Sequence, residues 1–366
     1  MASSPTSPLR VLLIAPSLEI TGGQAVQASR LLEAFRMVRG LRVDFMPLNP
    51  ALRGPLAPLA NIRFLRTCLR SVLYNTRLLT RVPAYDVLHV FTASYWSYSL
   101  WTIPALLYAK LFRRPIVVNY RDGQLEDHLQ TWRSALPTLR RMDAIVAPSR
   151  FLVDVLARYG IAATSISNII DRERFSFRPR PQPRPRFLHN RMLDPLYNVP
   201  CTLRAFRIIQ DRYPSASLVI AHDGPSRREL EQLAAQLGLR NCRFVGQVPQ
   251  RRISELYDEA DIYLTSPNLD CMPGSLLECY ASGLPVVATE AGGIPYIATH
   301  EETALLVPLN DHEAMARQAL RLIEEPGLAE RIAANAYRYC LEFAEGPVSR
   351  QWLTLYRELA AAKRAG

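Results

Sequence analysis

Two carboxylates, Asp270 and Glu278, stand eight positions apart in the chain, with Gly274 and Ser275 between them. The residue pattern indicates that a helix begins at Gly274 or Ser275. Amides at the start of a helix carry partial positive charge, and a glycine there lets a phosphate approach the backbone closely. Carboxylates on either side would accept hydrogen bonds from sugar hydroxyls. The segment therefore predicts a site for a phosphorylated sugar.

Each carboxylate alone also allows a purely structural interpretation, in which Asp270 closes a turn and Glu278 is an exposed helix residue. The residues that follow argue against it. A buried strand is expected at 285–289, and Gly292 and Gly293 would then place a second glycine loop beside the first. This combination favours the sugar-phosphate site.

The elements that must position these residues are short apolar runs that alternate with helical patterns. In the first half of the chain the strand-like runs fall at 10–16, 43–48, 87–91, 116–120 and 144–148. In the second half they fall at 187–190, 217–221, 242–246, 262–266, 285–289 and 304–307. Alternation of this kind predicts an α/β fold with two parallel, doubly wound sheets.

A chain of 366 residues exceeds what one hydrophobic core usually supports, so we expect two domains. The first is expected at 9–175 and the second at 187–345. Between them, the proline- and arginine-rich stretch 176–186 predicts an extended linker, because proline removes amide donors. An amphipathic helix at 346–366 is expected to pack back toward the first domain. Ligands bind beyond the carboxyl ends of the strands in such sheets, which predicts a site in a cleft between the domains.

The stretch 270–293 resembles the donor-site signature of the retaining glycosyltransferases of family four. In that signature an acidic-x7-Glu pair is followed by an Ala-x-Gly-x-Pro-Val-Val strand and a Gly-Gly-x-Pro turn. The segments 21–24, 148–151 and 168–175 resemble further elements of the family. The resemblance implies the GT-B fold, in which two Rossmann-like domains face a cleft. It also implies transfer of a sugar from a nucleotide-diphosphate donor, with retention of anomeric configuration and without a metal.

Carried over to this chain, the resemblance assigns Glu278 to the ribose of the donor. Asp270 takes the position where the family usually has glutamate, near the transferred sugar and the positive charge that develops at its anomeric carbon. Its side chain is one methylene shorter than glutamate. Donor-binding roles also fall on the residues of the two glycine turns, which are Gly274, Ser275, Leu276, Gly292 and Gly293.

The resemblance assigns the donor diphosphate to Arg191, whose planar fork suits two phosphate oxygens. The alternative is that Arg191 is a surface residue at a strand end. The family's lysine a few residues further on is missing, and Tyr197 or Leu196 occupies its place. An ion pair at 4 Å is worth roughly 4 kcal/mol at an effective dielectric near 20, against about 0.5–1.5 kcal/mol for a neutral hydrogen bond. Tyr197 could therefore replace the geometry of the lysine but not its charge.

In the first domain, Gly22 and Gly23 join a strand to a helix and are expected to lie close to the donor phosphate or the acceptor. Where the family commonly has a histidine after its fourth strand, this chain has Arg121 and Asp122. Either would face the cleft, and we take Arg121 as the catalytic candidate. His128 follows closely, but a lone histidine is more often structural.

The composition excludes several other classes of protein. A net charge of +11 favours anionic partners, but no nucleic-acid-binding motif accompanies it, so nucleic acid is not expected. Six cysteines without a C-x-x-C pair and six histidines without H-E-x-x-H predict reduced thiols and no metal site. A pyridoxal-phosphate enzyme needs a lysine, and the two lysines, Lys110 and Lys363, are poorly placed for it. We expect no cofactor beyond the nucleotide sugar.

We expect a cytoplasmic protein, because there is no apolar run of about 18 residues and no signal-peptide pattern at the N-terminus. The stretch 61–82 interleaves leucines with five arginines and allows two interpretations. It is either a basic amphipathic surface that contacts the anionic inner face of a membrane, or a solvated helix face packed on its own domain.

The sequence therefore predicts a retaining glycosyltransferase that uses a UDP- or GDP-sugar. Its acceptor would be a hydroxyl of a polysaccharide, a lipid-linked glycan or a similar glycoconjugate. The alternative is a sugar-nucleotide-binding subunit or regulator with impaired catalysis. The missing lysine, the short Asp270 and the absent first-domain histidine all support that alternative.

Overall fold

The computed structural model describes residues 8–19, 22–52 and 61–365, so Thr21 of the expected glycine turn lies outside the described residues. The chain divides into two compact units. One comprises Met1–Ile169 with Glu345–Gly366, and the other comprises Ile170–Ala344.

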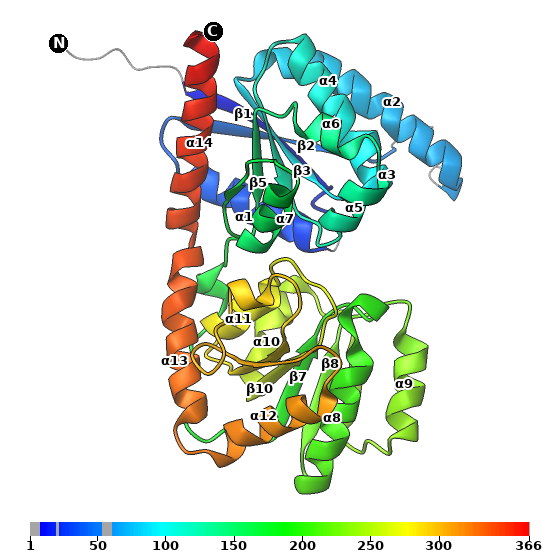
Figure 1. Cartoon of the computed structure of the whole chain (residues 1–366), viewed down its shortest axis with the longest axis vertical. Helices are drawn as coiled ribbons and strands as arrows, with labels where there is room; N and C mark the ends of the chain where they lie inside the picture. Colours follow the sequence, from blue (N-terminus) through cyan, green and yellow to red (C-terminus); the bar gives the residue numbers. More distant parts are fainter. Residues whose placement is uncertain (1–7, 20–21, 53–60, 366) are drawn as a thin grey trace, which may run out of the picture. The chain divides into compact units, whose positions relative to one another are not determined.

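The sheet of the first unit has six parallel strands in the order β2-β1-β3-β4-β5-β6 (Figure 1). The strands are β1 Leu9–Ala15, β2 Leu41–Pro47, β3 Val87–Thr92, β4 Ile116–Tyr120, β5 Ala144–Ala147 and β6 Thr164–Ser165. The central strands β3 and β4 are buried along their whole length, as their continuous apolar runs require of parallel strands covered on both faces. Val11 of β1 pairs with Val43 on one side and Val87 on the other, so the strand order reverses at β1.

The helices of the first unit are α1 Gly23–Arg36, α2 Arg63–Arg81, α3 Tyr95–Ser97, α4 Ile103–Leu111, α5 Leu125–Thr131, α6 Ala135–Leu139, α7 Arg150–Arg158 and α14 Glu345–Ala365. The last of these returns to the unit from the far end of the chain. Its Trp352 and Tyr356 are buried against β3, where the His89 ring stacks on Trp352 with centroids 4.1 Å apart. Among the described helices, none is long and apolar enough to cross a membrane.

The second unit contains another sheet of six parallel strands, in the order β12-β11-β10-β7-β8-β9. The strands are β7 Arg186–Asn190, β8 Ser217–Ala221, β9 Cys242–Gly246, β10 Ile262–Thr265, β11 Val286–Thr289 and β12 Leu305–Val307. Here the order reverses between β7 and β10. In open sheets of this class such a switch point opens a crevice beyond the carboxyl ends of the two strands.

The helices of the second unit cover both faces of its sheet. They are α8 Val199–Arg212, α9 Arg227–Gln236, α10 Ile253–Glu259, α11 Gly274–Ala281, α12 His312–Glu324 and α13 Leu328–Cys340. One apolar core packs α10, α11 and α13 on the sheet, and a second packs α8, α9 and α12. The predicted α/β fold class with two doubly wound sheets is thereby confirmed.

The stretch 176–186, for which an extended linker is predicted, falls within the second compact unit, which begins at Ile170. Arg180 is buried in that unit and donates to the carbonyl oxygens of Tyr257 and Ser282, each at 2.7 Å. Arg178 and Arg184 both pair with the buried carboxylate of Asp261. The extended backbone is therefore held in place by arginine side chains, which composition alone does not reveal.

Candidate functional site

The candidate residues of the second unit gather at the switch point of its sheet. Arg191 follows β7 directly, and Asp270 lies in the loop that leaves β10. Ser275 and Glu278 belong to α11, which that loop enters. Because β7 and β10 are adjacent and parallel, residues far apart in sequence leave the sheet side by side at the same edge.

Arg191 and Asp270 form an ion pair with each other, through Nη2 and Oδ2. Arg191 also donates from Nη1 to Oγ of Ser275 at 3.4 Å. Burial alone would lower the pKa of Arg191, but Asp270, together with the neighbouring Tyr197, Tyr263 and Cys271, raises it above its ordinary value. From the sequence, Arg191 and Asp270 were each expected to contact the ligand separately. In the structure they form an ion pair with each other at the start of α11.

Tyr197 packs its ring against this arginine, with the guanidinium carbon 4.4 Å from the ring centroid. It ends a short 3-10 turn, Pro195–Tyr197, which is capped by the preceding Asp194. The neighbouring Leu196 instead donates its amide to Asp194 Oδ1 at 3.0 Å. Burial raises the pKa of Tyr197 despite the opposing effect of Arg191, so the side chain is a neutral support for the arginine. Of the two residues that the sequence left open, Tyr197 is the one in contact with Arg191.

Glu278 is 8% exposed on α11 and accepts a hydrogen bond from the Tyr257 hydroxyl at 2.9 Å. The same hydroxyl accepts from Asn190 Nδ2 at 3.2 Å. The carboxylate is thus oriented by α10 and by the end of β7, which carries Asn190. Sequence reasoning missed Tyr257 and Asn190, because neither lies in a recognisable motif.

The second glycine turn packs directly on the loop that carries Asp270. A Cβ on Gly292 would lie 2.4 Å from the Asp270 carbonyl oxygen, and one on Gly293 would lie 1.9 Å from that of Cys271. The amide of Gly293 donates to the Asp270 carbonyl at 2.7 Å. The backbone donor of Gly293 is therefore bonded within the protein. The two glycines are required for the close approach of two backbone segments.

Gly274 differs from this pair, because a Cβ there would meet no described atom within 4 Å. It is the first residue of α11, where amides have no intrahelical acceptor. The Leu276 amide donates to the Pro273 carbonyl at 3.2 Å, and the Leu276 side chain is buried in the core. The open approach for an anion is therefore at Gly274, with Ser275 and Arg191 beside it.

In the first unit, Gly22 precedes α1 and Gly23 begins it, and α1 is the first helix after β1, the strand at which the sheet order reverses. Arg121 follows β4 and bonds through Nη2 to the Asn168 side chain and through Nη1 to Asn119 Oδ1 at 3.4 Å. Its guanidinium also lies over the Phe91 ring, 4.8 Å from the centroid. Arg121 is therefore held by its own unit at the carboxyl edge of the sheet.

His128 is fully buried, and its Nδ1 lies 2.6 Å from the Tyr120 hydroxyl. Burial lowers its pKa to about 4, so the ring is neutral at physiological pH. The structural role expected for His128 agrees with this environment.

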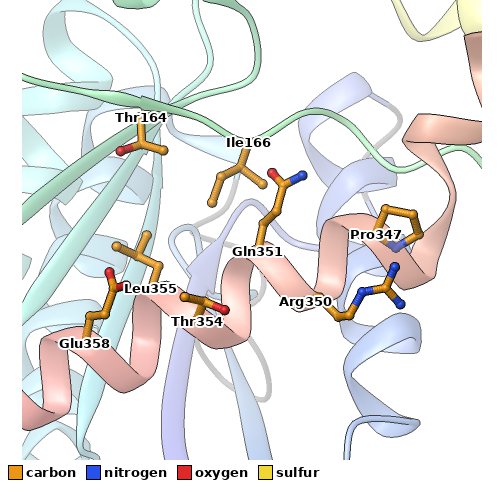
Figure 2. Close-up of a pocket in the computed structure, with 8 residues that line it drawn as sticks. All are labelled: Thr164, Ile166, Pro347, Arg350, Gln351, Thr354, Leu355 and Glu358. Atoms are coloured by element: carbon orange, nitrogen blue, oxygen red, sulfur yellow. The ribbon is translucent and has the colours of Figure 1, made fainter.

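A hollow of about 520 Å³ also lies in the first unit, between β6 and α14 (Figure 2). Figure 2 shows Ile166 and Leu355 lining it together with Gln351 and Arg350. None of the candidate site residues contributes to this lining, so we assign it no part in the chemistry.

Known families match both halves of the chain. The family Glycosyltransferase Family 4 matches residues 21–174, and Glycosyl transferases group 1 matches residues 171–339. The chain belongs to the glycosyltransferases of this family 4, group 1 type, with a GT-B fold.

Among curated relatives, an exopolysaccharide phosphotransferase of Streptomyces coelicolor is 30% identical over 72% of this chain and 28% of its own length. The amylovoran biosynthesis glycosyltransferase AmsK of Erwinia amylovora is 28% identical over 64% of this chain and 60% of its own. The chain thus spans less than two thirds of the length of these relatives.

Solved structures share the fold at low sequence identity. Anabaena HepE in complex with UDP and glucose has a TM-score of 0.72 at 18% identity and covers 95% of this chain and 99% of its own. A sucrose-phosphate synthase from Thermosynechococcus elongatus has a TM-score of 0.78 at 19% identity, with coverage of 97% and 100%.

Proposed function

We propose that the chain is a retaining glycosyltransferase that transfers a sugar from a UDP- or GDP-sugar, without a metal, to an acceptor hydroxyl. The observation that carries the proposal is the cluster of Arg191, Ser275 and Asp270 at the start of α11, with Glu278 one turn further along the same helix. A helix N-terminus with an adjacent arginine suits a diphosphate, and a buried, oriented carboxylate suits ribose hydroxyls.

Each residue then has a defined task in the reaction. Arg191 and the first amides of α11 hold the diphosphate and stabilise the charge that it gains on leaving. Glu278 binds the ribose. Asp270 faces the transferred sugar, where a carboxylate stabilises positive charge at the anomeric carbon. For retention without an enzyme nucleophile, the leaving phosphate accepts the proton of the acceptor hydroxyl on the same face of the sugar.

In the first unit, we propose that Gly22 and Gly23 take part in binding the donor, and that Arg121 is a catalytic residue that stabilises negative charge in the transition state. The acceptor is proposed to be a growing polysaccharide or lipid-linked glycan. The support for this is the relationship to proteins named for exopolysaccharide and amylovoran biosynthesis. A UDP-sugar is the first donor to test, because HepE has been crystallised with UDP-glucose.

A thermal-shift screen of UDP-, GDP- and ADP-sugars would identify the donor, because a ligand at 100 times its Kd stabilises the protein by about 2.7 kcal/mol.

With that donor, Asp270→Ala should lower kcat by about 100-fold or more, as expected for loss of a charge that acts in the transition state. Glu278→Gln should chiefly raise KM for the donor.

Matched controls are Asp258→Ala and Glu290→Gln, which make the same changes at exposed positions of the second unit. Folding of all four variants should be checked by circular dichroism. Wild-type turnover in folded Asp270→Ala and Glu278→Gln would refute the site.

A second candidate is a sugar-nucleotide-binding subunit with impaired catalysis. The direct pair between Arg191 and Asp270 favours it, because each charge already neutralises the other. Saturable donor binding with neither transfer to any glycan acceptor nor slow hydrolysis of the donor would support this candidate over the first.

A further inference from the structure

Three aromatic side chains, Tyr95, Trp96 and Trp132, meet at the carboxyl edge of the sheet in the first unit. Tyr95 and Trp96 lie in α3, which follows β3, and Trp132 directly follows α5, which comes after β4 (Figure 1). The rings of Trp96 and Trp132 meet edge to face with centroids 5.3 Å apart, and the Tyr95 ring is 6.0 Å from that of Trp132. We call these three residues the aromatic platform. It lies beyond the carboxyl ends of two adjacent parallel strands, where sheets of this class bind their ligands.

The most exposed ring of the aromatic platform is that of Trp96. This residue is 68% exposed, although tryptophans are highly buried on average. Trp132 beside it is half-buried, and its Nε1 donates to Ser99 Oγ at 2.7 Å, which fixes the orientation of the ring. An exposed indole that is braced by a second, oriented indole is suited to packing against a ligand.

The backbone that carries the platform is strained. Tyr95 has a φ of 57°, in the left-handed region, which is a genuine outlier for a bulky residue. The residues after α3, Tyr98–Thr102, form a π-helical turn in place of an α-helical one. Both features concentrate at ligand-binding sites, because they persist only where the surrounding contacts hold them.

A buried polar network holds this strained segment in place. The amide of Ser94 donates to Asp122 Oδ2 at 3.0 Å, and the Ser94 hydroxyl lies 3.0 Å from that of Tyr120. Asp122 also accepts the amide of Gln124 at 3.0 Å, through Oδ1. Because Asp122 directly follows Arg121, the network ties the aromatic platform to the segment that carries the proposed catalytic arginine.

A carboxylate borders the platform. Asp127 is exposed on α5 and accepts a hydrogen bond from the Tyr95 hydroxyl. Burial, this hydrogen bond and the charges of Asp127 and Asp122 raise the pKa of Tyr95 to about 12, so the phenol stays protonated and remains the donor. A carboxylate can accept about four hydrogen bonds, so Asp127 can also accept from a ligand hydroxyl.

We infer that the aromatic platform and Asp127 bind a pyranose ring, the acceptor sugar of the proposed reaction, and that Trp96 determines acceptor specificity. The C–H bonds on one face of a pyranose pack against the electron-rich face of an indole, while the hydroxyls at its edge donate to a carboxylate. This combination selects a glycan over an acceptor that has no sugar ring. The acceptor role rests on the proposed function, whereas binding of a sugar by the platform does not.

The test is saturation-transfer NMR of the full chain, without donor, using methyl β-D-galactopyranoside and methyl β-D-glucopyranoside as probes. At least one of them should receive saturation at its ring C–H protons. Trp96→Ala should weaken its binding by about fivefold, because the stacked ring is lost, and Trp96→Phe should retain most of the affinity. Asp127→Asn should also weaken binding by about fivefold, because a neutral amide oxygen accepts a hydroxyl less strongly than a carboxylate does.

Controls in the same unit are Phe64→Ala, at an exposed phenylalanine of α2, and Asp154→Asn, at an exposed aspartate of α7. Both should bind the probe as the wild type does. With donor present, Trp96→Ala should raise KM for a glycan acceptor by about fivefold and leave kcat and the donor KM unchanged.

Binding of neither probe by the wild type, or unchanged binding by the folded Trp96→Ala variant, would overturn the inference. It would also be overturned by a dimer, seen in light scattering, that Trp96→Ala dissolves in a protein that binds neither sugar. Sugar binding that depends on Trp96, in a protein that transfers no sugar, would support the platform and refute the proposed function.

Discussion

Hydrogen bonds to the carboxylate of Glu278 define the site at the scale of single residues. The hydroxyl of Tyr257 donates to that carboxylate and accepts from Asn190. Burial raises the pKa of Tyr257 well above its usual range, and the charge of Glu278 raises it further. The phenol therefore stays protonated and remains a donor. We regard Tyr257 as a positioning residue that holds Glu278 in the orientation needed for a ribose.

Tyr257→Phe should raise KM for the donor by roughly tenfold while changing kcat little, because a hydrogen bond to a charged group is worth about 1.5–3 kcal/mol. Steady-state kinetics with the donor varied would measure the change. Tyr280→Phe is the matched control, since the buried Tyr280 hydroxyl donates to the Ile297 carbonyl, whereas Glu278 accepts from Tyr257. Equal effects of the two changes would mean that Tyr257 acts through stability alone.

At the scale of elements, α11 is held at both ends. Its C-terminal end and that of α10 are joined by the buried Arg180, which donates to the carbonyls of Ser282, Tyr257 and Ala260. Carbonyls at the end of a helix carry partial negative charge and attract such a cation. At the other end, the loop that leads into α11 is braced by the turn at Gly292 and Gly293. The helix that carries the candidate site is thereby fixed against its sheet.

Gly293→Ala and Gly274→Ala should separate the two uses of glycine in this site. Gly293→Ala should reduce the free energy of unfolding by about 3 kcal/mol, because the added methyl meets backbone that no rotamer change can relieve. Gly274→Ala should leave stability nearly unchanged and weaken donor binding, because the methyl enters the approach to the first amides of α11. Urea unfolding and thermal shift with the donor measure the two effects. Similar stability losses in both variants would contradict this distinction.

At the scale of the whole molecule, each unit contains its own sheet, its own switch point and fully buried histidines. His89 and His128 lie in the first unit, and His189 lies in the second. Burial lowers the pKa of all three, to about 4 for His128 and about 3 for His189. Each ring is therefore neutral in the folded protein at pH 7, whereas the unfolded chain binds a proton below about pH 6.5.

This difference predicts a loss of stability in mild acid. The contribution of each histidine is fully present above about pH 6.5 and is lost as the pH falls from there toward the folded pKa. The free energy of unfolding should fall by at most about 1.4 kcal/mol per pH unit for each histidine. Chemical unfolding between pH 7 and pH 4.5 would measure it, and His128→Gln should flatten the curve. A stability that stays constant over this range would contradict the prediction.

The sequence by itself determined the two parallel sheets, because strand and helix periods are local properties of the chain. It also determined the stretch from Asp270 to Gly293 as a candidate donor site, since the two carboxylates and the glycines lie close together in the sequence. The basic, amphipathic character of 61–82 was visible for the same reason. These features depend on residue types and short spacings, which need no knowledge of how the strands are ordered.

The tertiary structure alone decided which distant groups meet. The pair between Arg191 and Asp270 joins residues 79 positions apart, because β7 and β10 are neighbours in the sheet. The contact of Tyr257 with Glu278 and the burial of Arg180 arise from packing between helices, which no local period encodes. The outward side of α2 was likewise decided by packing, because Tyr74 and Leu78 fill the core. A pattern in sequence shows that a helix has two faces, but only its neighbours determine which face is buried.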